Sequence, residues 1–143
     1  MPAEARPPFA LPLVATVYLI SLLLSASSYG DPIPFMGRFY TGKAAACLVF
    51  VDCLVSLYLA IGTMKRQRLT VWLIIGYNLL DLVSALLNLA LIPLEEYARV
   101  SQVAISQDAV FFDTLAAGGI LLFISVYVFR KRRYFYNRSP YLF

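Results

Sequence analysis

LTVWLIIGYNLLDLVSALLNLALI, residues 69–92, is long enough to cross a bilayer as a helix, yet it carries a line of polar side chains. At about 100° per residue, its polar residues fall on one stripe about 120° wide, which holds Tyr77, Asn78, Asp81, Ser84 and Asn88. An unpaired polar group in hydrocarbon costs several kcal/mol, so this stripe must face other helices or a wet cavity. The segment therefore predicts neighbouring spans.

The composition indicates the class of protein. The 143 residues are 61% hydrophobic and 14% charged, whereas soluble domains are about 45–50% apolar and about 25% charged. Four apolar segments each match the roughly 30 Å hydrocarbon core of a bilayer: 9–28, 43–64, 69–92 and 109–129. We predict an all-α, polytopic membrane protein, a single antiparallel bundle of four transmembrane helices with a basic tail at 130–143.

Positive charge gathers in the connection 65–68 and in the tail. By the positive-inside rule both are cytoplasmic, which requires an even number of spans and places both termini inside the cell. We expect the protein in the plasma or inner membrane. The first segment also resembles a signal peptide that ends in small residues. Cleavage would leave three spans with the C-terminus still inside, so charge does not decide between a retained helix and a cleaved leader.

Two aspartates lie near the middle of their spans, Asp52 on a face shared with Ser56 and Asp81 on the polar stripe. The short connection 65–68 makes these spans antiparallel neighbours, so both carboxyl groups lie at similar depth and can meet. No basic residue lies at that depth, and a buried carboxylate without a counter-ion stays protonated or binds a cation. We predict a ligand- or cation-binding site made of Asp52, Asp81, Asn78, Asn88, Ser84, Ser56 and Tyr77.

Three functions are compatible with this acidic site. We favour binding or transport of a proton, a cation or a small polar or cationic ligand. Alternatively, protonated aspartates hydrogen-bonded to neutral partners hold helices together in a structural or assembly subunit of a larger membrane complex. A lipid-active enzyme using the carboxylates comes third, because the chain has no histidine to act as the usual general base or zinc ligand. We assign no catalytic residue and no cofactor, and the sequence does not identify a metal.

A second group of charges lies near the outer ends of the spans. Asp113 lies about one turn into the last span, while Arg38 and Lys43 precede the second. We expect Asp113 to lie less deep than the other two acids and to pair with Lys43 or Arg38 across an outer mouth.

The connection 29–42 is a loop by composition, with three glycines and two prolines. Its aromatic residues are typical of the membrane interface. A lid over a binding site is the alternative.

The expected partners follow from the last span and the tail. The tail interleaves arginines with Tyr134, Phe135 and Tyr136, which suits either a stop-transfer flank anchored at the interface or a segment that recruits anionic lipid. Small residues on two faces of the last span favour tight helix contact, within the chain, in a homo-oligomer or with a partner membrane subunit. No segment remains for an RNA-binding fold, so we expect the lipid bilayer and not nucleic acid as a partner.

The topology predicts which residues are reachable from outside. In a variant with Cys47 and Cys53 replaced by serine, a membrane-impermeant maleimide added to intact cells should label single cysteines placed in 30–42 or 93–107. Cysteines placed in 65–68 should react only after permeabilisation, because that connection is predicted to be cytoplasmic. Labelling at 65–68 in intact cells would show that the orientation is wrong.

Overall fold

The computed structural model describes residues 10–102 and 106–138, and four long apolar helices make up most of them. Each is long and apolar enough to cross a membrane, so the predicted all-α membrane fold is confirmed. They are α1 (Ala10–Ser27), α2 (Gly42–Met64), α3 (Arg68–Leu91) and α5 (Gln107–Arg130). The ends of the predicted segments at residue 9 and at 139–143 lie outside the described residues. Residues 1–9, the start of the segment that resembles a signal peptide, lie outside them as well.

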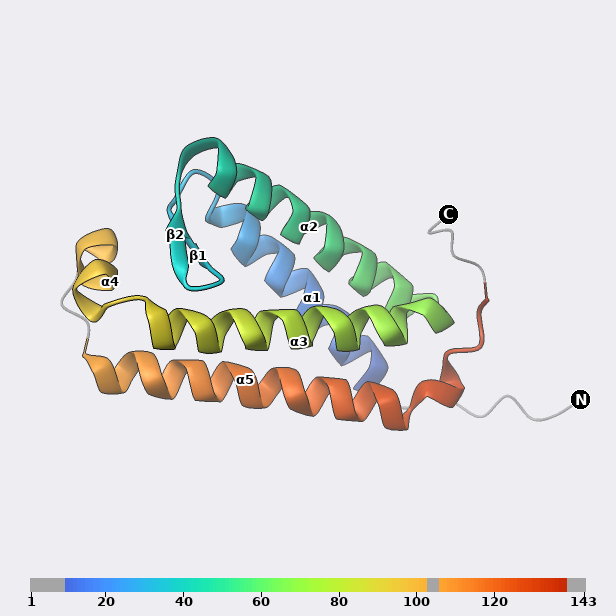
Figure 1. The fold of residues 1–143 in the computed structure, drawn as a ribbon. Coiled ribbons are helices and arrows are strands. Elements are labelled where there is room, and N and C mark those ends of the chain that lie inside the picture. The colour runs from blue at the N-terminus through green and yellow to red at the C-terminus, as the bar shows by residue number, and fades with distance from the viewer. Residues whose placement is uncertain (1–9, 103–105, 139–143) are drawn as a thin grey trace, which may run out of the picture.

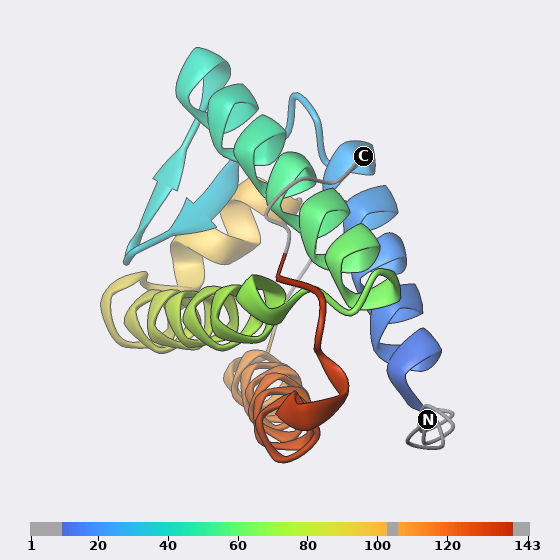
Figure 2. The ribbon, with the colours of Figure 1, turned by 90° about the vertical axis from the view of Figure 1, so that its right-hand side faces the viewer.

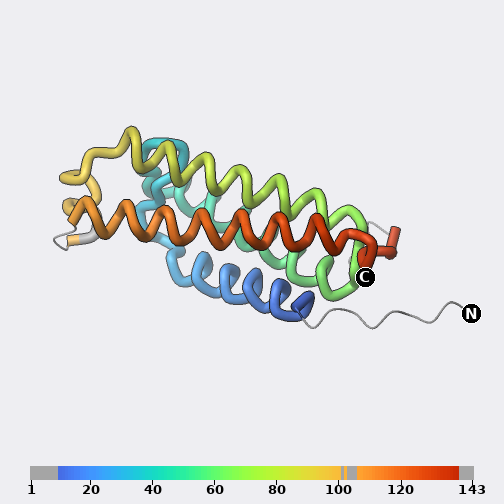
Figure 3. The backbone as a smooth tube through the Cα atoms, turned by 90° about the horizontal axis from the view of Figure 1, so that it is seen from below, coloured from blue at the N-terminus to red at the C-terminus, as the bar shows by residue number. Residues whose placement is uncertain are grey.

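The helices form two antiparallel pairs, α1 with α2 and α3 with α5 (Figure 1). The pairs meet where α2 turns into α3, and from there α2 diverges from α3 (Figures 1 and 2). Figure 3 shows that all four helices run lengthwise between the two ends of the molecule. We call the end with residues 65–68 and 130–138 the basic end, and the opposite one the hairpin end.

The hydrophobic core is concentrated at the basic end. Leu59 of α2, Ile74 of α3 and Val128 of α5 are completely buried there, and Tyr18 of α1 belongs to the same cluster. Large apolar side chains such as Phe123 cover the outer surface, which suits contact with lipid. The helix pairs are therefore held together at the basic end and apart at the hairpin end.

The turn between α2 and α3 is tight, and the segment after α5 holds it in place through backbone hydrogen bonds. The N–H of Gln67 donates to the carbonyl of Gly62 (2.9 Å), and Gln67 is completely buried. Asn137 donates its N–H to the carbonyl of Arg66 (3.1 Å) and accepts from the N–H of Arg68 (2.8 Å). Phe135 is buried in the core, so it is not the interfacial anchor that the sequence suggested.

The connection between α1 and α2 forms a small hairpin of β1 (Ile33–Phe35) and β2 (Arg38–Tyr40). Met36 and Gly37 form its two-residue turn with φ of +49° and +83°, as a type I′ turn requires. The composition of this connection predicts only a loop. The ring of Phe39 packs edge-on against Tyr97 of the short helix α4 (Leu94–Ser101), with centroids 5.3 Å apart.

Close packing at the α2–α3 turn generates a stability prediction. A methyl group at Gly62 would overlap the buried Thr70 hydroxyl and press on Gln67, so Gly62→Ala should lower the free energy of unfolding by about 1–3 kcal/mol. Gly76→Ala is the matched control, because nothing lies near its added methyl group and alanine favours the helix by about 0.5–1 kcal/mol. Unfolding in detergent measures both changes. Equal stability of the two variants would contradict the close packing.

Candidate ligand-binding cavity

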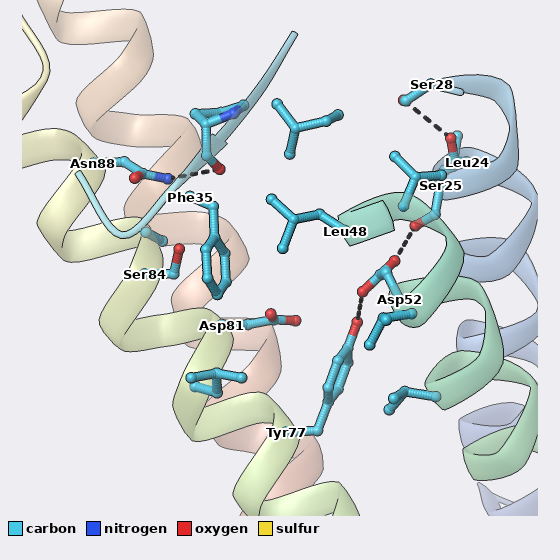
Figure 4. A pocket seen from close by; sticks show the side chains of 17 residues that line it. Leu24, Ser25, Ser28, Phe35, Leu48, Asp52, Tyr77, Asp81, Ser84 and Asn88 are labelled. Atoms are coloured by element: carbon cyan, nitrogen blue, oxygen red, sulfur yellow. Dashed lines mark hydrogen bonds between the residues drawn. The ribbon is translucent and has the colours of Figure 1, made fainter. Parts of the chain in front are cut away.

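A cavity of about 480 Å³ lies between α1, α2 and α3 at the hairpin end, where the helix pairs diverge. Pro34 and Phe35 of β1 form part of its wall, and Phe35 points into it (Figure 4). The remaining lining is largely apolar, from residues such as Leu48 and Leu80. Its polar side chains are Ser25, Ser28, Asp52, Tyr77, Asp81, Ser84 and Asn88.

Two carboxyl groups face this cavity. Asp52 of α2 accepts hydrogen bonds from the hydroxyl groups of Ser25 and Tyr77, one on each carboxylate oxygen. Asp81 lies about one turn beyond Tyr77 on α3 and points across the cavity toward Asp52 (Figure 4). Both aspartates are half-buried. The structure thus brings the two mid-span acids to one space, with Asp52 held in a fixed orientation by neutral donors.

The cavity has no basic side chain in its lining. The ion pair found within residues 10–102 and 106–138 joins Glu96 and Arg99 of α4 at 3.8 Å, and neither residue lines the cavity. Ionised Asp52 or Asp81 therefore creates a negative potential that no residue of the cavity neutralises. The largely apolar walls lower the local dielectric constant, which strengthens the attraction of such a charge for a cation.

The part of the α3 stripe at the hairpin end holds the hairpin in place. The N–H of Met36 donates to the hydroxyl of Ser84 (3.1 Å), and the N–H of Gly37 donates to the amide oxygen of Asn88 (2.7 Å). Asn88 in turn donates to the carbonyl of Pro34 (3.2 Å). These hydrogen bonds fix the hairpin beside the cavity, where Pro34 and Phe35 form part of the wall.

Asn78 and Ser56 do not line the cavity. Asn78, only 2% exposed, accepts from the hydroxyl of Tyr18 (2.9 Å) and donates to Ser125 of α5 (3.0 Å). It therefore joins α1, α3 and α5. Ser56 is completely buried in α2. The structure thus places five of the seven predicted site residues around the cavity and assigns Asn78 to helix packing.

The predicted outer mouth does not form. Asp113 is exposed on α5 and makes no ion pair with Lys43 or Arg38 in the described structure. Arg38 instead donates from Nε to the hydroxyl of Tyr40 (2.7 Å), and its guanidinium lies 4.8 Å from the centre of that ring. Lys43 is exposed at the start of α2. The hairpin engages Arg38 within its own strand, away from the last span.

Sequence reasoning missed Ser25, Ser28 and Phe35 as cavity residues. A signal was present for the two serines, because Tyr18, Ser21, Ser25 and Ser28 recur every three or four residues and mark one helix face. No periodic signal identifies Phe35, since its direction depends on the register of a three-residue strand.

The fold and the cavity define the class, a small multi-pass membrane protein. Comparisons with protein-family models, with curated proteins and with solved structures found no match to this chain. In the part of the chain that the structure describes, no three histidine, cysteine or acidic residues gather as a metal site would require.

The hairpin contacts predict a local change when Asn88 is replaced. Asn88→Ala removes two hydrogen bonds, each contributing about 1 kcal/mol, so the Gly37 amide should exchange with deuterium about tenfold faster or more. Thr114→Ala is the control, because that hydroxyl donates only within its own helix, to Val110. Hydrogen exchange followed by mass spectrometry of the 29–42 peptides makes the measurement. Unchanged exchange in the Asn88 variant would show that these bonds do not hold the hairpin in place.

Proposed function

We propose that the cavity binds a small organic cation and that protons compete for the same carboxylates. The observation that carries this proposal is that Asp52 and Asp81 line one cavity whose lining contains no basic side chain. Intramembrane acids facing a cavity are typical of ion and ligand pathways. Charge neutralisation is the physical reason for binding, because a cation supplies the counter-ion that the chain does not place there.

The size and lining favour an organic amine as the ligand class. Small-molecule sites commonly measure about 300–1,000 Å³ and combine apolar walls with a few polar groups, and the cavity of about 480 Å³ has this character. An ammonium group can donate hydrogen bonds to Asp81 and Asp52, while its hydrocarbon part contacts Phe35, Leu48 and Leu80. Tyr77 and Ser25 hold the Asp52 carboxylate in position for this contact.

The same chemistry supports transport. A proton and a cation cannot occupy one carboxylate together, so release of one favours binding of the other. We further propose that the basic end faces the cytoplasm, where its arginines meet the anionic leaflet. The hairpin then covers the cavity on the outer side, and its opening would admit the ligand.

A structural or assembly subunit is the second candidate. The exposed face of α5 favours it, because a line of small residues there is not used within the described chain. The opposite face, with Gly118 and Ser125, already packs on α3. In this alternative, the hydrogen bonds to Asp52 serve only to hold α1, α2 and α3 together. The small outward-facing residues are Ala109, Ala116 and Ala117.

Replacement of Asp81 tests the proposal. Calorimetric titration of the purified protein with benzylammonium should show saturable binding, and the neutral isostere benzyl alcohol should bind at least about tenfold more weakly, because it lacks the charge. Asp81→Asn should abolish this preference and leave the protein folded. Asp113→Asn is the matched control, since it removes the same charge from an exposed position on α5.

Acidification provides an independent readout. Benzylammonium binding should weaken as the pH falls, because a protonated carboxylate no longer offers a negative charge. In a protein that uses these acids only for packing, benzylammonium and benzyl alcohol would bind equally or not at all. Asp81→Asn would then be nearly silent, because asparagine keeps most hydrogen bonds. Either result would overturn the proposed binding function.

A further inference from the structure

A second cavity, of about 530 Å³, lies at the basic end, where the chain after α5 crosses the first turn of α3. Four arginines contribute to its lining: Arg68 of α3, Arg132 and Arg133 of the short helix η1 (Arg132–Tyr134), and Arg138. Trp72 and Tyr136 are the aromatic residues at its exposed edge. This cavity is separate in residues and position from the acidic one.

The fold holds these arginines together through its own contacts. Phe135, between the arginines of η1 and Arg138, is buried in the core. Asn137 is fixed by backbone hydrogen bonds to Arg66 and Arg68. The segment that carries three of the four arginines is therefore fastened across the start of α3, and the cationic groups do not depend on a free tail to converge.

No carboxylate of the described chain neutralises this cluster. Asp52 and Asp81 lie in the acidic cavity, and none of the lining residues of the second cavity is acidic. The ion pair found in the part of the chain that the structure describes joins Glu96 and Arg99 of α4, which lies at the hairpin end, away from this cavity (Figure 1). Four like charges around one space repel one another, and this repulsion favours the entry of an anion.

The side chains indicate which anion fits. Guanidinium groups bind phosphate through paired hydrogen bonds. On the lipid-facing side, Trp72 meets Phe129 edge-on with centroids 6.2 Å apart, and the Arg132 guanidinium lies 4.6 Å from the Phe129 ring centre. Tryptophan and arginine in this arrangement are typical of the headgroup level of a membrane.

We propose that this cavity binds the headgroup of an anionic phospholipid that carries a phosphate monoester. The phosphate enters among the four arginines, and the acyl chains lie along the apolar surface beside Trp72 and Phe129. A monoester suits the cluster better than a phosphodiester, because it carries more negative charge and more free oxygen atoms. The site is specific to the folded C-terminal segment, which distinguishes it from diffuse attraction of a polybasic tail.

Lipid titration of the purified protein tests the site. Native mass spectrometry from detergent micelles should show that dioctanoyl phosphatidic acid binds and that dioctanoyl phosphatidylcholine does not. The double variant Arg132→Gln, Arg138→Gln should bind phosphatidic acid about tenfold more weakly or worse, since each charge-assisted hydrogen bond lost weakens binding by about that factor. Arg130→Gln is the matched control, because it removes the same charge from the exposed end of α5, outside the cavity lining, and should change binding by less than about twofold.

A folding control and a competitor make the outcome decisive. Thermal unfolding identifies any variant that fails to fold. If the double variant fails, Arg133→Gln, at an exposed position in the cavity lining, replaces it, and phosphatidic acid should again bind about tenfold more weakly. Inorganic phosphate in the millimolar range should not displace the lipid. Equal losses in Arg130→Gln and the cavity variants would overturn the proposal in favour of diffuse attraction. Displacement by inorganic phosphate would show a soluble-phosphate site instead, and equal binding of phosphatidylcholine would exclude phosphate monoester recognition.

Discussion

The polar side chains of the α3 stripe need hydrogen-bond partners, because an unpaired polar group in an environment without bulk water is costly. The other helices and the hairpin are arranged so that they supply most of these partners. Asn78 finds partners on α1 and α5 and draws those helices to α3. Asn88 finds them in the backbone of the hairpin. Between them, Asp81 faces a cavity instead of a protein donor from another helix. One line of side chains thus joins helices, lines the cavity and holds the hairpin in succession.

The uneven core explains why a chain of this size contains a cavity at all. Completely buried apolar residues such as Leu59 and Ile74 close the contact between the helix pairs at the basic end. The small Gly62 and the backbone hydrogen bonds of Asn137 tighten the same region. At the hairpin end α2 and α3 diverge, and a β-hairpin occupies part of the gap. Close packing at one end thus leaves a cavity at the other.

Charges of opposite sign are kept at different depths of the molecule. The acidic cavity lies between the spans with no basic residue in its lining, and the arginine cavity lies at the basic end with no acidic one. In a soluble protein, such groups would be hydrated or paired at the surface. Here packed apolar side chains separate the acidic from the basic residues. Each cavity therefore lacks a counter-charge from the chain, and a bound ion of opposite charge would supply it. Both proposals rest on this one electrostatic constraint.

Length, composition and helical periodicity alone predicted four spans, and the charge pattern added an orientation. Those are local properties, because a helix satisfies its own backbone and needs only an apolar run of sufficient length. The short connection also placed Asp52 and Asp81 at similar depth. Only the tertiary structure decided that Asn78 joins helices while Asn88 holds the hairpin, that Phe35 points into the cavity and that Arg38 does not reach Asp113. Helix divergence and strand register select these partners, and neither is encoded in the periodicity of a single segment.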